Sequence, residues 1–485
     1  MPSRASFLPS WLVLAFAASA TAQTASSLAE ARKRYELGTI AESASDLAGA
    51  RREYEEAIRL APRMAVAHDR LGFVRGLQGE TGEAIAHFEE AVRLDPRLFD
   101  ARYHLGATLW WAGRSREALP VLREAVTLRP DHPEARYYLG LALEQQGRTD
   151  EAIGELRRVV KRAPRLAPAH LHLGLALQKQ GDLPGALSAL REAVALDPKD
   201  KDAANSLGLV LLQKGESEEA LRTFQKLVAE QPDFREARHN LGSALMQMGD
   251  LEGAIAVYRE LLLRDDGDAE ALYNLGMALK QRDDFAGAEA ELRKATALDR
   301  SLPEPPYTLA VVLWQTGRPE EAVVQLREAI ARKPDYADAH YVLGTVLRQL
   351  GQPDEALAEL RATIRYQPTS AEAHLSLGQL LQQKKQTSEA AVAFAEAQRL
   401  LRRKADAQAA TFAVSVGLAR IKDNDATGAI ERFREAVRLS PDYPEAHYQL
   451  ALALLSAGVQ AEAHAEFAKA HRLAPHLTPP EAKHP

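Results

Sequence analysis

The sequence predicts an all-α solenoid built from tandem pairs of antiparallel helices, and three periodic features predict it. Small residues recur every 34 residues, beginning with Gly38, Gly72 and Gly106, and an Ala follows each of them by twelve residues. Leu precedes the small residue in twelve of the thirteen repeats. A Gly seven residues after it and a Pro near the end of most units mark the ends of the two helices. Such a pair cannot bury its apolar face alone, so stacking of pairs must supply the core.

The first residues of the chain have the layout of a secretory signal peptide. A basic residue, Arg4, precedes an apolar stretch from Trp11 to Ala18, and Ala20 and Ala22 have the spacing of a cleavage site. We therefore expect cleavage after Ala22, so that residues 1–22 are removed and the mature chain is periplasmic or secreted. The alternative is an uncleaved membrane anchor, although the apolar stretch is short for a membrane helix and Pro9 interrupts it. We expect no stable membrane insertion of the mature chain.

The repeats occupy nearly all of the remaining sequence. Residues 23–30 form a short lead, and residues 31–409 hold repeats 1 to 11. Residues 410–477 hold repeats 12 and 13, and residues 478–485 form a tail. We number the repeats by their small residues, which are Gly38, Gly72, Gly106, Gly140, Gly174, Gly208, Gly242, Gly276, Ala310, Gly344, Gly378, Gly417 and Ala451.

Two junctions between repeats depart from the pattern. In repeat 8, Glu289 and Thr296 stand where the second helix otherwise presents apolar residues to the next unit, and Pro303 delays the following helix. We expect this junction to be the weakest stack of the interior, with harmless drift of one repeat as the alternative to a functional hinge. Five extra residues follow repeat 11, near Arg402. Because they contain neither Gly nor Pro, they predict an extended second helix rather than a loop.

Composition and motifs disfavour several classes of function. The 485 residues carry 61 Lys and Arg against 67 Asp and Glu with the signs interspersed, which disfavours nucleic-acid binding. The absence of Cys excludes disulfides, thiolate metal sites and Cys nucleophiles. The sequence contains neither a phosphate-binding Gly loop nor a metal-ligand spacing, and its acidic connection around Gly267 lacks the EF-hand spacing. We therefore predict a non-enzymatic protein without catalytic residues, metal sites or cofactors.

The repeats resemble those of the tetratricopeptide repeat (TPR) family. The resemblance rests on the order Leu-Gly, Ala, aromatic or Leu, Ala and Pro in strings such as EARYYLGLALEQQGRTDEAI, and it covers residues 31–477. It implies a right-handed superhelix in which the first helix of each pair lines a concave groove. It also implies that the groove wall carries the residues six and three before the small residue and one, four and five after it.

These wall positions are acidic, aromatic and amide-bearing. The first is acidic in nine repeats, the second is Tyr in seven, and the last is Gln in seven. Such a wall suits an extended, partly basic polypeptide held by aromatic anchors. The predicted partner-binding residues are Phe73, Tyr103, Trp110, Trp111, Glu134, Tyr137, Tyr273, Tyr307, Trp314 and Tyr341. The alternative is that the acids only complement the helix dipoles and that the Tyr rings pack between repeats.

The sequence thus predicts an exported scaffold that binds a polypeptide and mediates complex assembly. A carbohydrate- or cell-wall-binding module is the second hypothesis, because Trp, Tyr, Gln and acidic residues also suit sugars. The identity of the partner, the biological process and the oligomeric state do not follow from the sequence.

Overall fold

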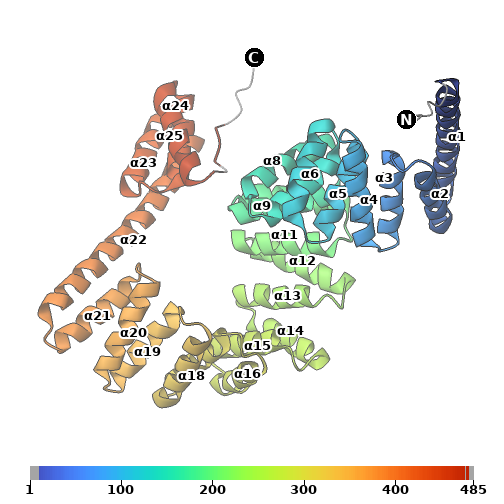
Figure 1. Ribbon diagram of the computed structural model, residues 1–485. Helices are drawn as coiled ribbons and strands as arrows, with labels where there is room; N and C mark the ends of the chain where they lie inside the picture. Colours follow the sequence, from blue (N-terminus) through green and yellow to red (C-terminus); the bar gives the residue numbers. More distant parts are fainter. Residues whose placement is uncertain (1–9, 476, 480–485) are drawn as a thin grey trace, which may run out of the picture. The chain divides into compact units, whose positions relative to one another are not determined.

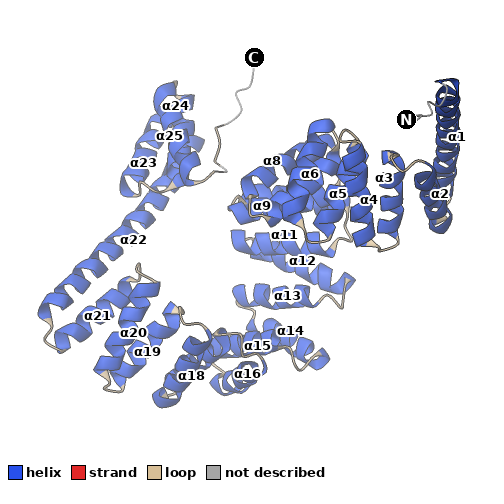
Figure 2. Ribbon diagram, viewed as in Figure 1, coloured by secondary structure: helices blue, strands red, loops and turns tan. Residues whose placement is uncertain are grey.

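A computed structural model describes residues 10–475 and 477–479 of the chain (Figure 1). This part of the chain forms twenty-five α-helices and no strand (Figure 2). From α1 to α10 and from α12 to α25, each helix packs against its neighbours in the sequence, and the two helices of a repeat form an antiparallel pair. The predicted fold class, an all-α solenoid of tandem helix pairs, is confirmed.

The helices have nearly uniform lengths, apart from α1 and α22. The first helices of the repeats are α1 (Ser10–Ser43), α3 (Ala65–Leu77), α5 (Phe99–Trp111), α7 (Pro133–Gln145), α9 (Ala167–Gln180), α11 (Lys201–Lys214), α13 (Arg235–Gln247), α15 (Ala269–Gln281), α17 (Glu304–Gln315), α19 (Ala337–Gln349), α21 (Ala371–Gln383) and α24 (Pro444–Ser456). The second helices are α2 (Leu47–Leu60), α4 (Thr81–Leu94), α6 (Ser115–Leu128), α8 (Thr149–Arg162), α10 (Leu183–Leu196), α12 (Ser217–Glu230), α14 (Leu251–Arg264), α16 (Phe285–Leu298), α18 (Pro319–Arg332), α20 (Pro353–Tyr366), α23 (Ala426–Leu439) and α25 (Gln460–Leu473). Helix α22 (Thr387–Lys422) belongs to both repeats 11 and 12.

The chain divides into two compact units, residues 1–203 and 204–485. The division falls inside α11, whereas the sequence analysis placed a boundary between residues 409 and 410, which lies inside α22. Within each unit the core repeats the same contacts from one helix pair to the next, as expected for a solenoid.

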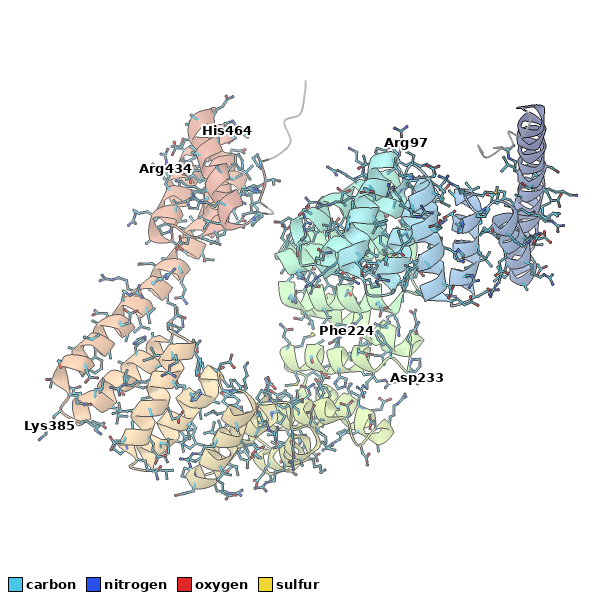
Figure 3. The ribbon with its side chains drawn as sticks, viewed as in Figure 1. Arg97, Phe224, Asp233, Lys385, Arg434 and His464 are labelled. Atoms are coloured by element: carbon cyan, nitrogen blue, oxygen red, sulfur yellow. The ribbon has the colours of Figure 1, made fainter. Side chains whose placement is uncertain are left out.

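The small residues allow the two helices of a repeat to approach closely. An added Cβ on Gly208 would lie 2.5 Å from the ring of Phe224, and one on Gly242 would lie 2.5 Å from the ring of Tyr258. Phe224, labelled in Figure 3, is completely buried in α12. The thirteen Ala residues that follow the small residues by twelve positions are all buried as well. The 34-residue period is therefore a period of close helix contacts.

The turn between the two helices has the same backbone conformation in all thirteen repeats. Nine repeats have Gly seven residues after the small residue, with φ between 70° and 92°. The other four have a residue with a side chain there, and each also has a positive φ: Ser45, Asp283, Lys385 and Asn424. The left-handed conformation costs a residue with a Cβ about 1–2 kcal/mol, which is why Gly predominates.

Replacing Lys385 by Gly is expected to stabilise the turn between α21 and α22. Lys385 (Figure 3) has a φ of 60°, and its substitution by Gly removes the steric cost of a Cβ in that conformation. We expect a gain of about 0.5–1 kcal/mol, reduced from the full steric cost because Gly also makes the unfolded chain more flexible. Thermal unfolding of the purified variant would measure it. Gly351→Ala, at the equivalent turn one repeat earlier, should destabilise the chain, and an equal effect of both changes would contradict the explanation.

The N-terminal segment is continuous with the first repeat. Arg4 and Pro9 lie outside the described residues, while the apolar stretch from Trp11 and the short lead lie in α1. Helix α1 then packs on α2 as the first helix of repeat 1. Within the described ranges, no helix combines the length and the apolar character that crossing a membrane requires.

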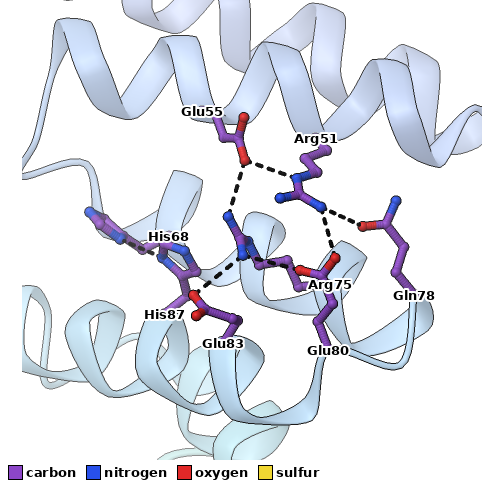
Figure 4. Close-up of polar contacts among 8 residues, drawn as sticks. All are labelled: Arg51, Glu55, His68, Arg75, Gln78, Glu80, Glu83 and His87. Carbon is purple, nitrogen blue, oxygen red and sulfur yellow. Dashed lines mark hydrogen bonds and ion pairs between the residues drawn. The ribbon is translucent and has the colours of Figure 1, made fainter.

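The junction between repeats 1 and 2 contains a network of charged side chains (Figure 4). Arg51 of α2 and Arg75 of α3 both pair with Glu55, at 2.9 and 3.1 Å, and both pair with Glu80, at 2.8 and 3.1 Å. Beside them, His68 donates from Nε2 to the carbonyl of Pro62 (3.1 Å), so its Nδ1 accepts from Nδ1 of His87 (3.2 Å). Burial, with smaller effects of the neighbouring His68 and Arg75, lowers the pKa of His87. Charged residues at stacking positions are thus compatible with a packed junction.

Arg side chains also form hydrogen bonds across the junction between repeats 8 and 9. The Arg332 side chain, only 7% exposed, donates to the carbonyl oxygens of Thr296 (3.0 Å), Asp299 (3.1 Å) and Leu302 (2.8 Å). Arg318 donates to both carboxylate oxygens of Glu289, at 2.8 and 2.9 Å. Glu289 is therefore paired with Arg318, the residue before α18, whereas Thr296 meets Arg332 only through its backbone carbonyl and donates its hydroxyl to the carbonyl of Leu292.

Helix α22 replaces a connection between two repeats. The sequence analysis expected an extended second helix in repeat 11, and the helix extends further, through the whole first helix of repeat 12. Residues 401–405 and 407–409, in its middle, are all exposed. Repeats 11 and 12 are consequently joined end to end along one helix rather than through a turn.

Candidate functional site

The first helices line one side of each unit and contact one another. In unit 1, α3 contacts α5, α5 contacts α7 and α7 contacts α9, and in unit 2 the same holds along α13, α15, α17 and α19. Successive second helices make no comparable contact in the part of the chain that the structure describes. The first helices therefore lie on the inner side of each unit, and we call the surface they form the first-helix wall.

Side chains on this wall form a ladder between neighbouring repeats. The residue three before the small residue contacts a residue of the next repeat, 35 positions later in the chain. Asp69 thus pairs with His104 at 2.8 Å, and Asn240 donates a hydrogen bond to Asn205 at 2.8 Å. A residue four after the small residue meets the one 28 positions later, as Glu144 meets His172 at 3.3 Å. Both contacts converge on the residue two before the small residue, a position that the sequence analysis did not include.

An aromatic cluster occupies this ladder in unit 1, and Tyr138 is at its centre. The ring of Tyr138 lies 5.6 Å from that of Trp110, 6.1 Å from that of Tyr103 and 5.5 Å from that of Tyr137. The indole nitrogen of Trp111 donates to the Tyr138 hydroxyl at 3.1 Å. Sequence reasoning grouped the two Trp residues with Tyr137 and missed Tyr138. The signal was available, because Tyr138 follows the wall position of Glu134 by four residues and shares its helix face.

Trp111 is the most accessible member of the cluster. Its side chain is 71% exposed, whereas Trp110, Phe73, Tyr103 and Tyr137 are half-buried. The ring of Trp111 is held by an edge contact with Trp110, with centroids 5.0 Å apart, and by its hydrogen bond to Tyr138. An exposed indole with two fixing contacts loses little conformational entropy on binding, so it suits a binding anchor.

The remaining rings of the cluster extend it towards repeat 2. Phe73 lies 5.2 Å from the ring of His104 and beneath the guanidinium of Arg70, at 4.9 Å. Burial, with smaller effects of Tyr138 and Glu134, raises the pKa of Tyr103 to about 12, and burial also raises that of Tyr137. Both phenols are therefore neutral at physiological pH and keep their hydroxyl donors.

Trp110 and Trp314 occupy equivalent positions but differ in their hydrogen bonds. The indole nitrogen of Trp314 donates to Gln349, 35 residues later, at 2.8 Å. The indole nitrogen of Trp110 is buried and has no protein partner. Trp110 is thus held by its ring contacts, and Trp314 by a polar bond to the next repeat.

The second predicted cluster does not assemble as expected. The ring of Tyr307 lies 5.1 Å from that of Tyr336. Among the described residues, Trp314 makes no ring contact with Tyr307 or with Tyr341, although all four predicted residues lie on first helices. Burial raises the pKa of Tyr273 and of Tyr307. These residues therefore lie at separate positions along the first-helix wall and do not form one aromatic cluster.

The nine acidic wall residues lie in the first turns of first helices. They are Asp100, Glu134, Asp202, Glu236, Glu270, Glu304, Asp338, Glu372 and Glu445. This position favours the helix dipole, as the alternative interpretation holds. Asp100 pairs with Arg129 at 3.2 Å, whereas the Glu134 carboxylate lies 3.3 Å from His132, and the Glu134 side chain remains about half exposed. The half-buried Tyr rings also agree with packing between repeats, so position alone does not distinguish the two interpretations.

The repeats match family models along most of the chain. Residues 108–167, 171–233 and 239–303 match one tetratricopeptide repeat model, and residues 313–380 match a second. Residues 77–113 and 417–458 match a third, described as a TPR repeat. The chain belongs to the tetratricopeptide repeat family, and this membership supports a role as a scaffold for protein–protein interaction.

Several solved structures are similar to parts or to most of the chain. MamA from Desulfovibrio magneticus RS-1 is 26% identical, covers 35% of this chain and 97% of its own, with a TM-score of 0.33. YrrB, described as a TPR protein with an unusual peptide-binding site, is 28% identical over 35% of this chain and 88% of its own, with a TM-score of 0.33. Yeast Tom70 is 13% identical over 92% of this chain and 98% of its own, with a TM-score of 0.42. No curated protein matches the chain in sequence.

Proposed function

We propose that this chain is a non-catalytic, exported scaffold that holds an extended, partly basic polypeptide against the first-helix wall. Export to the periplasm or the medium is supported by the signal-peptide pattern of residues 1–22. The single observation that carries the binding proposal is Trp111, an indole that is 71% exposed and fixed from behind by Trp110 and Tyr138. Aromatic anchors of this kind provide most of the energy in many interfaces.

The basic character of the partner is supported by the charge along the wall. Acidic residues begin nine first helices, and Glu134 lies in the same helix as Tyr137 and Tyr138. A Lys or Arg of a bound segment would find aromatic faces for cation–π contact and carboxylates for ion pairing on the same helices. Among the second helices of each unit, acidic side chains pair with Arg of a neighbouring repeat, as in Arg123–Glu151 in unit 1 and Arg327–Glu355 in unit 2.

Substitution of Trp111 by Ala is expected to weaken peptide capture by about 10- to 100-fold. The purified chain would be used to select from a library of short random peptides, and the affinities of the selected sequences for both variants would be measured. Selected peptides should be rich in Lys or Arg beside apolar residues. The matched control is Leu263→Ala, which removes an apolar side chain that is 87% exposed on a second helix.

Unchanged affinity in the Trp111→Ala variant, or equal losses in both variants, would contradict the assignment. Selection of no peptide, together with binding of the same chain to an oligosaccharide array, would favour the carbohydrate-binding hypothesis.

A further inference from the structure

Because α22 runs straight from repeat 11 into repeat 12, these two repeats do not stack on each other, and the helix faces that would form their junction are uncovered. In ten repeats the residue five before the small residue is an Ala that is completely buried: Ala67, Ala101, Ala135, Ala169, Ala203, Ala237, Ala271, Ala339, Ala373 and Ala446. In unit 1, Ala135 belongs to one buried cluster with Ala125 and Val126 of the preceding second helix. This position therefore marks the face of a first helix that the previous repeat covers.

In repeat 12 this position is Phe412, and its side chain is 71% exposed. Val416 replaces the Leu that precedes the small residue and is buried in repeats 2 to 11 and 13, and Val416 itself is only half-buried. We call Phe412 and Val416 the start face of repeat 12. A large aromatic side chain at a position that is otherwise covered marks an interaction surface.

The partner face lies on the first half of the same helix. Ile85, Leu119 and Ile153, thirteen residues after their small residues, are buried against the next repeat, and the equivalent residue of repeat 11, Ala391, is exposed. Gln398, seven residues further on, is exposed as well. We call Ala391 and Gln398 the end face of repeat 11.

The two faces cannot meet within one chain as they would at a regular junction. A regular junction has a turn that lets the first helix fold back on the preceding second helix, whereas α22 runs straight through. At about 1.5 Å per residue, Ala391 and Phe412 lie roughly 30 Å apart along the helix. The exposed middle of α22 confirms that no other segment of the described chain covers the gap.

We propose that a second copy of this chain covers both faces: the end face of repeat 11 in one copy stacks on the start face of repeat 12 in the other, and the converse contact closes a two-fold dimer. Every copy carries both faces in equal number, so the reciprocal exchange leaves neither uncovered. The other junctions of the chain establish that a second helix of this repeat type is what covers such a start face.

Polar residues at the two faces do not oppose this stacking. Gln398 stands where nine of the other repeats have Val or Ile, but the junctions at Arg51 and at Glu289 also carry polar residues and still pack. The reduced size of Ala391 leaves room on the end face, while Phe412 adds volume on the start face. The two faces are therefore compatible in volume, and it is the continuous helix α22 that keeps them apart within one chain.

Sedimentation of the purified full chain over a range of concentrations would test the dimer. We expect a dimer for the natural sequence and a dissociation constant at least about tenfold higher for Phe412→Arg, because a buried aromatic anchor is replaced by a charge. The matched control is Leu263→Arg, which places the same charge on another exposed apolar site away from both faces and should leave the dimer intact. Circular dichroism would check that each variant keeps its helix content.

The absence of Cys from the chain allows a second, geometric test. Chains with Ala391→Cys and chains with Val416→Cys would be mixed and oxidised, and a disulfide is expected only in the mixture, since each face meets the opposite one. A natural chain that stays monomeric at every concentration, a dimer unaffected by Phe412→Arg, or disulfides formed by either variant alone would overturn the proposal.

Discussion

Replacing Phe224 by Ala is expected to cost about 3–5 kcal/mol of stability, and the loss should be confined to the neighbourhood of repeat 6. The ring of Phe224 is completely buried and fills the space left by Gly208, whose added Cβ would lie 2.5 Å from it. Its removal leaves a cavity that the close helix pair cannot collapse to fill. Because each repeat contacts only its neighbours, helices several repeats away keep all their contacts.

Hydrogen exchange resolved along the chain would measure this effect. Amides of α11 and α12 should exchange faster in the variant, while those of α19 and α20 should be unchanged. Val324→Ala is the control, because Val324 is an exposed apolar residue of α18 and its truncation should change little. Uniform acceleration along both units would show that the array unfolds as one body and would contradict nearest-neighbour stabilisation.

The second large effect is expected at Arg332. In Arg332→Met the side chain keeps its length but loses the donors for the carbonyl oxygens of Thr296, Asp299 and Leu302. We expect a loss of about 1–3 kcal/mol, since these partly buried acceptors lose their partner. Denaturant unfolding, with hydrogen exchange of α16 and α17 to locate the change, would measure it.

The same helix provides the control for Arg332. Arg327 lies on α18, is 58% exposed and pairs with Glu355 at 2.7 Å. Arg327→Met should cost less than about 1 kcal/mol, because exposed ion pairs contribute little. Equal losses at the two positions would mean that the charge of α18, rather than the carbonyl contacts of Arg332, stabilises the junction.

Most of the fold was predictable because each repeat uses the same residue types at the same positions. The spacing of small residues, the Ala twelve positions later and the Gly at the turn each correspond to a close contact or a left-handed residue in the structure. The turn conformation persists even where Lys385 or Asn424 replaces Gly. At these positions the packing of the helix pair determines the backbone, so the residue type there is a preference and not a requirement.

The contacts across the first-helix wall were less predictable. A period of 34 residues states which positions are equivalent, but the neighbours along the wall are 28 and 35 residues apart. These offsets depend on how each helix pair is displaced against the next, which no single repeat encodes. For this reason the sequence did not reveal the role of Tyr138. It also predicted a second cluster whose residues do not contact one another in the structure.

The extent of α22 and the anchoring by Arg332 were missed for a different reason. The segment after repeat 11 lacks both Gly and Pro, so the sequence favours continuation of the helix, but the point at which repeat 12 begins resembles an ordinary first helix. Arg332 satisfies backbone carbonyls that lie 30 to 36 residues earlier, and backbone acceptors leave no mark in the sequence.

The thirteen equivalent left-handed turns have a consequence for how such a gene changes. Because residues 34 apart occupy the same place in the repeat, an in-frame deletion or duplication of any 34 consecutive codons within a regular stretch rejoins a chain with the same order of turns and contacts. The event need not respect the start of a repeat. An event that crosses α22 lacks this tolerance, because there the spacing is 39 residues, from Gly378 to Gly417, and no turn separates repeat 11 from repeat 12.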